Sequence, residues 1–381
     1  MMVLAPSMER GFTCAIGIGG IGAGIVYALK GDHDLGRNES RLGDLLDARD
    51  YCKLHIVQHY IARLMGADNN SAPFRVLPIG VVGNDSVGRQ LLSEMAIAGL
   101  DTQFVRTDPS LRTLFSVCFI YPDGSGGNIT SSNSAAAGLT FDDLRAALPY
   151  MKPAGPHGVA LCLPEVPLEL RQNFLRLASQ CGNYRVCSFV LGEIEEAQDL
   201  GLLALTDLLA VNKEEASALL GITVGRTSDT SFLNECAAAL TAIRRELRVI
   251  LTVGENGAYG FEGGCWQFSP APAVQAVSTA GAGDALLAGV VCGLAAGLPF
   301  IAPGQHGASF VGRSLHTALD LGVLNSSFSV TSPHTIHPDA VLKNLIAFAE
   351  SHGALISDEL WSVCSDQEQL RSSSERSSHL V

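Results

Sequence analysis

The chain has 381 residues, 47% of them apolar, which is enough to bury one large core or two of ordinary size. Its formal net charge of -13 argues against nucleic acid as the main partner, because a phosphate backbone is bound by basic surface. The ten cysteines form no Cys-x-x-Cys pair, and most lie in apolar runs. We therefore expect free thiols rather than disulfides or a metal site.

The chain begins with a segment that we expect to be loose and disordered, residues 1–10. Residues 12–29 carry no charge, but their many glycines are atypical of a membrane-spanning helix. We interpret them as a buried strand followed by a glycine-rich turn, and we expect a cytoplasmic protein. The charged residues 31–50 that follow have the composition of a helix.

Apolar strand-like runs then alternate with amphipathic stretches up to residue 364. The expected strands are 12–18, 75–81, 114–121, 158–163, 185–190, 207–211 and 248–253. The expected helices are 53–65, 86–98, 140–148, 167–180, 213–220, 232–246, 282–296 and 306–321. This alternation predicts one α/β domain over 11–364, with a mostly parallel sheet covered on both faces. A β-hairpin is expected at 113–134, and a disordered polar tail at 365–381.

The strongest functional pattern is residues 278–284, Ser-Thr-Ala-Gly-Ala-Gly-Asp, followed at once by an apolar helix. A helix N-terminus offers free N–H donors and a partial positive charge, which suit a phosphate group. Glycine at 281 and 283 lets the backbone approach the anion closely. Asp284 lies in the first turn of the same helix. The pattern therefore predicts an anion site with a carboxylate beside it.

This pattern resembles the D-T-x-G-A-G-D motif of the PfkB carbohydrate kinase family, the ribokinase-like sugar and nucleoside kinases. Two further matches follow predicted strands: Asn-Lys-Glu-Glu at 212–215 and Thr-Val-Gly-Glu-Asn-Gly at 252–257. Residues 80–88 and 128–140 also resemble the family. The resemblance implies a ribokinase-like three-layer α/β/α fold with a small β-hairpin lid. It also implies ATP as the phosphate donor.

Residue roles follow from the resemblance, position by position. Asp284 would be the base that activates an acceptor hydroxyl, and the turn of Gly281, Ala282 and Gly283 would stabilise the transferring phosphoryl group. Glu215 would hold Mg²⁺. The residues expected to contact the nucleotide are Asn212, Thr252, Gly254 and Gly257. The expected reaction is transfer of the γ-phosphate to an alcohol group of a sugar, sugar phosphate or nucleoside.

The N-terminal segment departs from the family. The usual Asp after the first strand and the G-G-x-x-x-N segment, which grip sugar hydroxyls, are missing, so residues 31–60 are atypical. Ser278 replaces the leading Asp of the motif, which puts potassium dependence in doubt. A rebuilt acceptor pocket would use charged or imidazole side chains from this segment, namely Arg37, Glu39, Arg41, Lys53, His55 and His59. A solvated charged helix is the alternative.

Two other functions remain open. Gly17-x-Gly19-x-x-Gly22 with Glu39 downstream matches the dinucleotide fingerprint of an NAD-binding oxidoreductase. The missing sugar-gripping residues would also suit a catalytically silent nucleotide- or metabolite-binding protein on a kinase fold. The expected partners are a nucleotide and a small-molecule acceptor, without nucleic acid or membrane. The resemblance also implies a homodimer as a further expectation, because related kinases often dimerise through lid strands.

Overall fold

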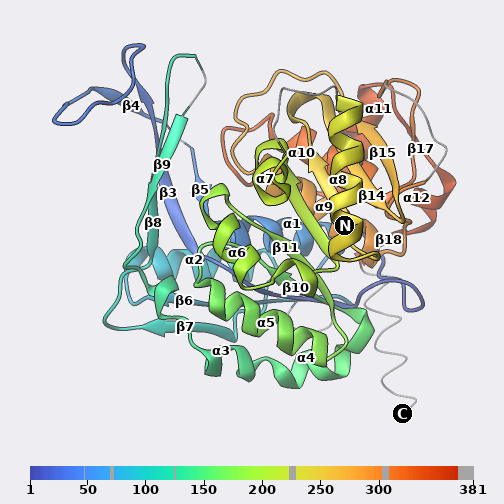
Figure 1. Ribbon diagram of the computed structural model, residues 1–381, viewed down its shortest axis with the longest axis horizontal. Helices are drawn as coiled ribbons and strands as arrows, with labels where there is room; N and C mark the ends of the chain where they lie inside the picture. The colour runs from blue at the N-terminus through green and yellow to red at the C-terminus, as the bar shows by residue number, and fades with distance from the viewer. Residues whose placement is uncertain (47, 69–72, 124–125, 223–228, 303–308, 368–381) are drawn as a thin grey trace.

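A computed structural model describes residues 1–46, 48–68, 73–123, 126–222, 229–302 and 309–367. Its centre is a nine-stranded sheet with the strand order β15-β14-β13-β12-β11-β10-β2-β6-β7 (Figure 1). Seven strands are parallel: β2 (Cys14–Ile18), β6 (Arg75–Gly83), β7 (Phe104–Asp108), β10 (Gly158–Cys162), β11 (Tyr184–Ser188), β12 (Leu208–Asn212) and β13 (Arg248–Thr252). The remaining two, β14 (Gly257–Glu262) and β15 (Cys265–Pro270), run antiparallel at one edge.

Helices cover both faces of this sheet. One buried cluster packs against α1 (Lys53–Met65), α2 (Ser86–Ile97), α9 (Ala282–Ala295), α10 (Ala318–Ser329) and α11 (Leu342–Ser351). A second cluster packs against α3 (Phe141–Ala146), α4 (Leu148–Ala154), α5 (Leu168–Gln180), α6 (Ile194–Asp199), α7 (Lys213–Leu220) and α8 (Asp229–Ile243). The central parallel strands, such as β2, β6 and β10, read as near-continuous apolar runs because both of their faces are buried, whereas the edge strand β7 is partly exposed. The predicted three-layer α/β/α fold is confirmed.

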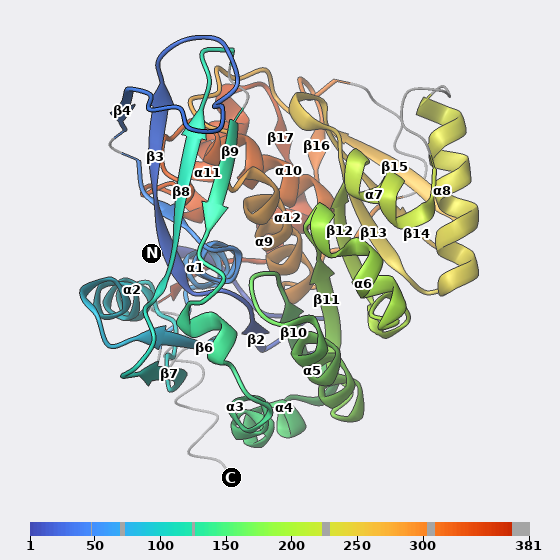
Figure 2. The same ribbon diagram turned by 60° about the vertical axis from the view of Figure 1, so that its left-hand side comes forward.

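A second sheet stands beside this body and forms a lid. It contains β3 (Gly22–Leu29), β4 (Gly43–Leu45), β5 (Asp50–Tyr51), β8 (Leu114–Ile120) and β9 (Gly126–Thr130). Strand β3 pairs in parallel with β8 and antiparallel with β4 and β5, whereas β8 and β9 form the predicted hairpin. Figures 1 and 2 show the lid projecting from the body. The lid is therefore larger than the small hairpin expected from the sequence.

The predictions for residues 22–50 were wrong. Residues 22–29 form a strand instead of a turn, because the distant strand β8 supplies their hydrogen-bond partners. Residues 31–46 form no helix, and their charges pair locally: the Arg41 side chain donates to Glu39 Oε1 (Nε–Oε1 2.7 Å) and to the carbonyl of His33 (2.6 Å). A run of opposite charges satisfied within a loop has the same composition as a solvated helix face.

Both chain ends also differ from expectation. Residues 1–10 are not loose: β1 (Met2–Leu4) pairs antiparallel with β18 (Cys364–Asp366), and Val3 and Leu4 are fully buried. Of the predicted disordered tail, residues 365 and 366 therefore belong to a strand, whereas 368–381 lie outside the described residues. A strand pair between segments over 350 residues apart leaves no local pattern in the sequence.

The helix predicted at 306–321 begins later, at Ala318. Thr317 caps it, with Thr317 Oγ1 accepting from the Asp320 amide while Asp320 accepts from the Thr317 amide, so the helix starts at that reciprocal pair. The preceding stretch contains β16 (Ser314–Leu315), which pairs with β17 (Leu355–Ile356), and a short helix α12 (Asp358–Ser362) follows β17. Residues 306–308 of the prediction lie outside the described residues.

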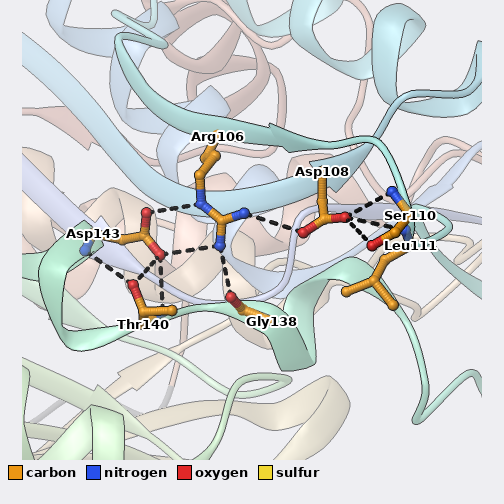
Figure 3. Close-up of polar contacts among 7 residues, drawn as sticks. All are labelled: Arg106, Asp108, Ser110, Leu111, Gly138, Thr140 and Asp143. Carbon is orange, nitrogen blue, oxygen red and sulfur yellow. Dashed lines mark hydrogen bonds and ion pairs between the residues drawn. The ribbon is translucent and has the colours of Figure 1, made fainter.

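A polar network holds the base of the lid, where β7 leads into β8 (Figure 3). Arg106 donates to Asp143 (Nε–Oδ1 3.0 Å), to Asp108 (Nη1–Oδ2 3.2 Å) and to the carbonyl of Gly138 (2.7 Å). Asp108 in turn accepts from the backbone and hydroxyl of Ser110. These bonds connect the last residues of β7 to the start of α3. They therefore hold in place the segment from which the lid strand β8 begins.

The ten cysteines are all free. Within the described residues, the structure contains no helix with the length and apolar character needed to cross a membrane.

Candidate active site

The N-terminus of α9 is open to solvent at its first turn. Gly281 is the N-cap with φ 76°, in the left-handed region that favours glycine, and no side chain caps the helix. The amide of Ala282 donates to the carbonyl of Thr279 (3.2 Å), so it is already engaged in this structure, and its part in the anion site stays a prediction. The amides of Gly283 and Asp284 have no backbone acceptor among the described residues, and the space beside Gly283 is empty. Two donors at a helix N-terminus thus remain free for an anion.

Asp284 lies next to these amides and faces a lysine from another helix. Its residue is 8% exposed, and Lys53 Nζ is 3.6 Å from its Oδ2. Burial raises the pKa of Asp284 above its ordinary value, and Lys53 counteracts part of that rise. Lys53 opens α1, which packs directly against α9. Two segments more than 200 residues apart therefore meet in one ion pair.

Lys53 is the centre of a group of carboxylates. Its pKa is raised chiefly by Asp284, against the opposing effect of burial, with further contributions from Glu165 and Glu215. The Lys53 side chain keeps 32% exposure. Of the residues proposed for a rebuilt acceptor pocket, Lys53 is the one that the structure brings to Asp284.

Glu165 belongs to this group and was missed in the sequence. Its Oε2 accepts from the backbone amide of Lys53 (3.2 Å), and burial raises its pKa to about 7. Glu165 adopts φ 75°, which is uncommon for a residue other than glycine and occurs mostly at functional sites. The available indication was its place three residues after β10, since the carboxyl ends of parallel strands meet at one edge of the sheet.

Asn212 and Glu215 cap α7 reciprocally. Asn212 Oδ1 accepts from the Glu215 amide (2.8 Å), and Glu215 Oε2 accepts from the Asn212 amide (2.9 Å). Burial raises the pKa of Glu215, and Lys53 opposes that rise. Asn212 is also the register partner of Thr252 on the neighbouring strand. The structure thus brings these three residues together at the carboxyl ends of β12 and β13.

Gly254 and Gly257 bound the short turn between β13 and β14. Both have positive φ, 61° and 122°, and the Val253 amide donates to the Gly257 carbonyl (3.0 Å). A side chain at Gly257 would lie 2.1 Å from the Ser269 carbonyl oxygen. These glycines therefore shape a tight turn beside Thr252, and their contact with a nucleotide stays a prediction.

Asp50 supplies an acid from the lid. Its Oδ2 accepts from Ser116 Oγ (3.0 Å) and Cys118 Sγ (3.2 Å), both on β8. A Cβ on the paired residue Gly24 would lie 2.5 Å from that carboxylate, so glycine makes room for it. After burial, Asp50 contributes to the raised pKa of Asp284. No pattern in the sequence singles out Asp50.

The other proposed pocket residues lie elsewhere. Arg37, Glu39 and Arg41 belong to the loop between β3 and β4, and both views place β4 toward the outer end of the lid (Figures 1 and 2). His55 is fully buried between Tyr51 and His59, with ring centroids 4.6 Å and 5.7 Å away. The structure does not bring these residues to Asp284.

The dinucleotide interpretation of Gly17, Gly19 and Gly22 was also wrong. That fingerprint requires a strand followed by a turn that opens a helix. Here Gly22 opens strand β3, and Gly17 lies inside strand β2. These glycines allow α1 to pack closely on the sheet, because a Cβ at Gly17 or Gly19 would clash with the Leu54 side chain at 2.8 Å or 2.9 Å.

A divalent cation fits at Glu215. Among the described residues, no group of three or more His, Cys, Asp or Glu side chains is arranged to hold a metal ion by itself. Mg²⁺ commonly binds through one or two carboxylates, waters and substrate phosphates, without a complete protein cage. Glu215 has one oxygen engaged by Asn212, which leaves the other for such a shared cation.

Comparison with known proteins agrees with this architecture. Residues 57–341 match the pfkB family carbohydrate kinases. Ribokinase from Giardia lamblia is 17% identical, with a TM-score of 0.69 over 89% of this chain and 100% of that chain. The nucleoside kinase of Burkholderia thailandensis in complex with inosine is 16% identical, with a TM-score of 0.63 over 88% and 97%.

Aminoimidazole riboside kinase from Salmonella enterica, complexed with aminoimidazole riboside and an ATP analogue, is 19% identical, with a TM-score of 0.60 over 88% and 99%. These likenesses establish the fold. Their coverage exceeds the part of the chain from residue 57 to the C-terminus, so the structural match also includes residues before the family match. With three quarters of its length matching the family pattern, the chain belongs to the pfkB family of carbohydrate kinases.

Proposed function

We propose that this protein transfers the γ-phosphate of ATP to an alcohol group of a neutral sugar or nucleoside. The observation that carries the proposal is the Asp284 carboxylate, placed in the first turn of α9 beside two free amides and 3.6 Å from Lys53. The proposed base, the amide donors for an anion and the Lys53 ammonium group thus lie close together. Phosphoryl transfer depends mainly on positioning and electrostatic stabilisation, which this arrangement supplies.

Asp284 accepts the proton of the acceptor hydroxyl as its oxygen attacks the γ-phosphorus. The amides of Gly283 and Asp284 donate to the equatorial oxygens of the transferring group, where negative charge is spread in the transition state. Lys53 favours the ionised form of Asp284, because its charge lowers a pKa that burial raises. Mg²⁺, held at Glu215 through water, would neutralise charge on the nucleotide phosphates.

The charges near the acceptor end favour a neutral acceptor. Asp50, Glu165 and Asp284 are acidic and electrostatically coupled, and Lys53 is the cation that faces them. Carboxylates accept hydrogen bonds from sugar hydroxyls but repel a phosphate. We therefore favour a sugar or nucleoside over a sugar phosphate. Ribose, inosine and aminoimidazole riboside are the first candidates, because structural relatives are named for or bind compounds of this kind.

The test is ADP release with Mg·ATP across these three compounds and two sugar phosphates, ribose 5-phosphate and fructose 6-phosphate. Wild-type protein should turn over at least one neutral acceptor. Asp284→Asn should lower kcat about 10²- to 10⁴-fold, the usual contribution of a general base, while ATP still raises the melting temperature as in wild type. Asp358→Asn, at an exposed acid in the first turn of α12, is the control and should be unchanged.

The outcomes separate the possible functions. Stabilisation by ATP without turnover on any acceptor would favour a silent binding protein. Turnover that survives Asp284→Asn would refute the assigned base, and a preference for the sugar phosphates would refute the neutral-acceptor assignment.

A further inference from the structure

A pocket of about 500 Å³ lies at the opposite end of α9 from Asp284. Its walls come from the N-terminal segment (Arg10, Phe12), the first residues of β11 and β13 (Tyr184, Arg248), and the chain after α9 (Leu298, Phe300). Asp284 lies in the first turn of this 14-residue helix, so the pocket is roughly 20 Å from the catalytic carboxylate. Its volume is in the range of small-molecule sites.

Three aromatic rings and two guanidinium groups line the pocket. Phe12 and Tyr184 are neighbours with ring centroids 5.2 Å apart, and Arg248 Cζ lies 5.8 Å from the ring centroids of both Tyr184 and Phe300. The flat faces of rings and guanidinium groups suit a flat ligand. Burial raises the pKa of Tyr184 to about 12, so its hydroxyl adds no negative charge at neutral pH.

The charge of the pocket favours an anion. Arg248 is paired with Glu262 (Nε–Oε1 2.6 Å) and donates to the Tyr184 hydroxyl (3.3 Å). Arg10 is exposed, and its guanidinium makes no ion pair with any residue that the structure describes. One cation is thus uncompensated, and its forked donors match a carboxylate or phosphate.

The negative end of α9 faces this region but is already satisfied. The amides of Ala296, Gly297 and Leu298 donate to the carbonyls of Cys292, Leu294 and Gly293. The Ser7 amide donates to the carbonyl of Ala295 (2.9 Å). Because these terminal carbonyls are occupied, they do not require a cationic ligand.

We propose that this pocket is a second small-molecule site, which takes a planar aromatic anion. The ring lies over the half-buried Tyr184 and Arg248, with the buried Phe12 and Phe300 as the floor beneath them, and the carboxylate or phosphate faces Arg10. The site is separate from the proposed phosphoryl-transfer centre, so its ligand does not compete with ATP.

The experiment measures the binding of 2-naphthoate by isothermal titration calorimetry, with 2-naphthamide as the neutral ligand of the same shape. Wild-type protein should bind naphthoate at least tenfold more tightly than naphthamide. Arg10→Ala should weaken naphthoate binding about fivefold or more, as expected for loss of a charged hydrogen bond. Because Arg10 is exposed, this variant tests the site without disturbing the core. Arg176→Ala, at an exposed arginine of α5, is the matched control and should bind within twofold of wild type.

A second variant keeps the local charge pairing balanced. Arg248→Gln combined with Glu262→Gln should weaken binding about tenfold or more, measured at a temperature where circular dichroism shows the variant folded. Saturating Mg·ATP and the Asp284→Asn substitution should leave naphthoate binding as it is in wild type. The proposal is overturned by an absence of binding at millimolar naphthoate, by equal affinity for naphthamide, by full affinity in Arg10→Ala, or by competition from ATP. None of these outcomes depends on kinase activity.

Discussion

The N-terminal end of α9, proposed as the catalytic end, is built from neighbouring residues of the chain, whereas the lid is built from segments that are far apart in sequence. Gly281, Gly283 and Asp284 lie within four consecutive residues, and one turn at the uncapped end of the helix places the free amides and the carboxylate together. The lid is assembled from β3, β4, β5, β8 and β9, which lie up to about 100 residues apart. The proposed phosphate end of the site is therefore a local motif, whereas the proposed acceptor end is a tertiary assembly.

The largest effect is expected where the two regions meet, at Lys53. Lys53→Met removes the cation that opposes the rise in the Asp284 pKa. Removal of an opposite charge at this distance raises a carboxylate pKa by about 1–3 units. The acid limb of the kcat–pH profile should therefore move to higher pH, with the loss of kcat growing as the pH falls. The measurement is a kcat–pH profile, with Lys343→Met at an exposed position as the control. If the kcat–pH profile of Lys53→Met does not move, Lys53 does not set the pKa of the catalytic base.

Glu165→Gln tests the carboxylate that sequence reasoning missed. Burial raises its pKa to about 7, so the carboxylate forms as pH rises through 7. If it accepts an acceptor hydroxyl, kcat/KM for the acceptor should rise between about pH 6 and 8 in wild type. The variant should be about tenfold lower at pH 8 and lack this rise.

The same group links stability to pH. Its folded pKa lies above the ordinary value of 4.5, so the folded protein retains this proton more tightly than the unfolded chain. The contribution to the free energy of unfolding is fully present below about pH 4.5 and is lost as pH rises through about 7. Urea titrations of wild type should show this decline across the window, and Glu165→Gln should diminish it. A contribution that instead grows with pH would contradict the assigned shift.

The smallest effect is expected from substitutions in the lid, where Asp50 and the outer-loop residue Arg37 can be compared. Asp50→Asn removes a carboxylate that sits beside the acceptor end and should raise the acceptor KM about three- to tenfold, with ATP KM unchanged. Arg37→Ala changes a residue of the outer loop and should leave both values within twofold of wild type. Equal effects of the two substitutions would mean that the acceptor reaches the outer lid, and the rebuilt-pocket hypothesis would regain support.

Six of the nine strands of the central sheet were predicted, because they are apolar runs, whereas β7, β14 and β15 were missed. Strand β7 carries Arg106, Thr107 and Asp108 and does not read as an apolar run. The seven expected strands and most of the expected helices are present within a few residues of their predicted bounds. Two other failures share one cause. Residues 22–29 and 2–4 become strands through partners at 114–120 and 364–366, and no local pattern predicts such a partner.

The candidate site divides in the same way. Spacing within one turn of chain was enough to single out the glycine turn, Asp284, Asn212 and Glu215, whereas the reciprocal cap between Asn212 and Glu215 is seen in the structure. The contact of Lys53 with Asp284, and the positions of Glu165 and Asp50 near this pair, depend on the tertiary structure. The packing of α1 against α9 and the pairing of β5 with β3 bring these groups together. Charges from separate elements acquire their pKa values from that packing, which excludes water and fixes their neighbours.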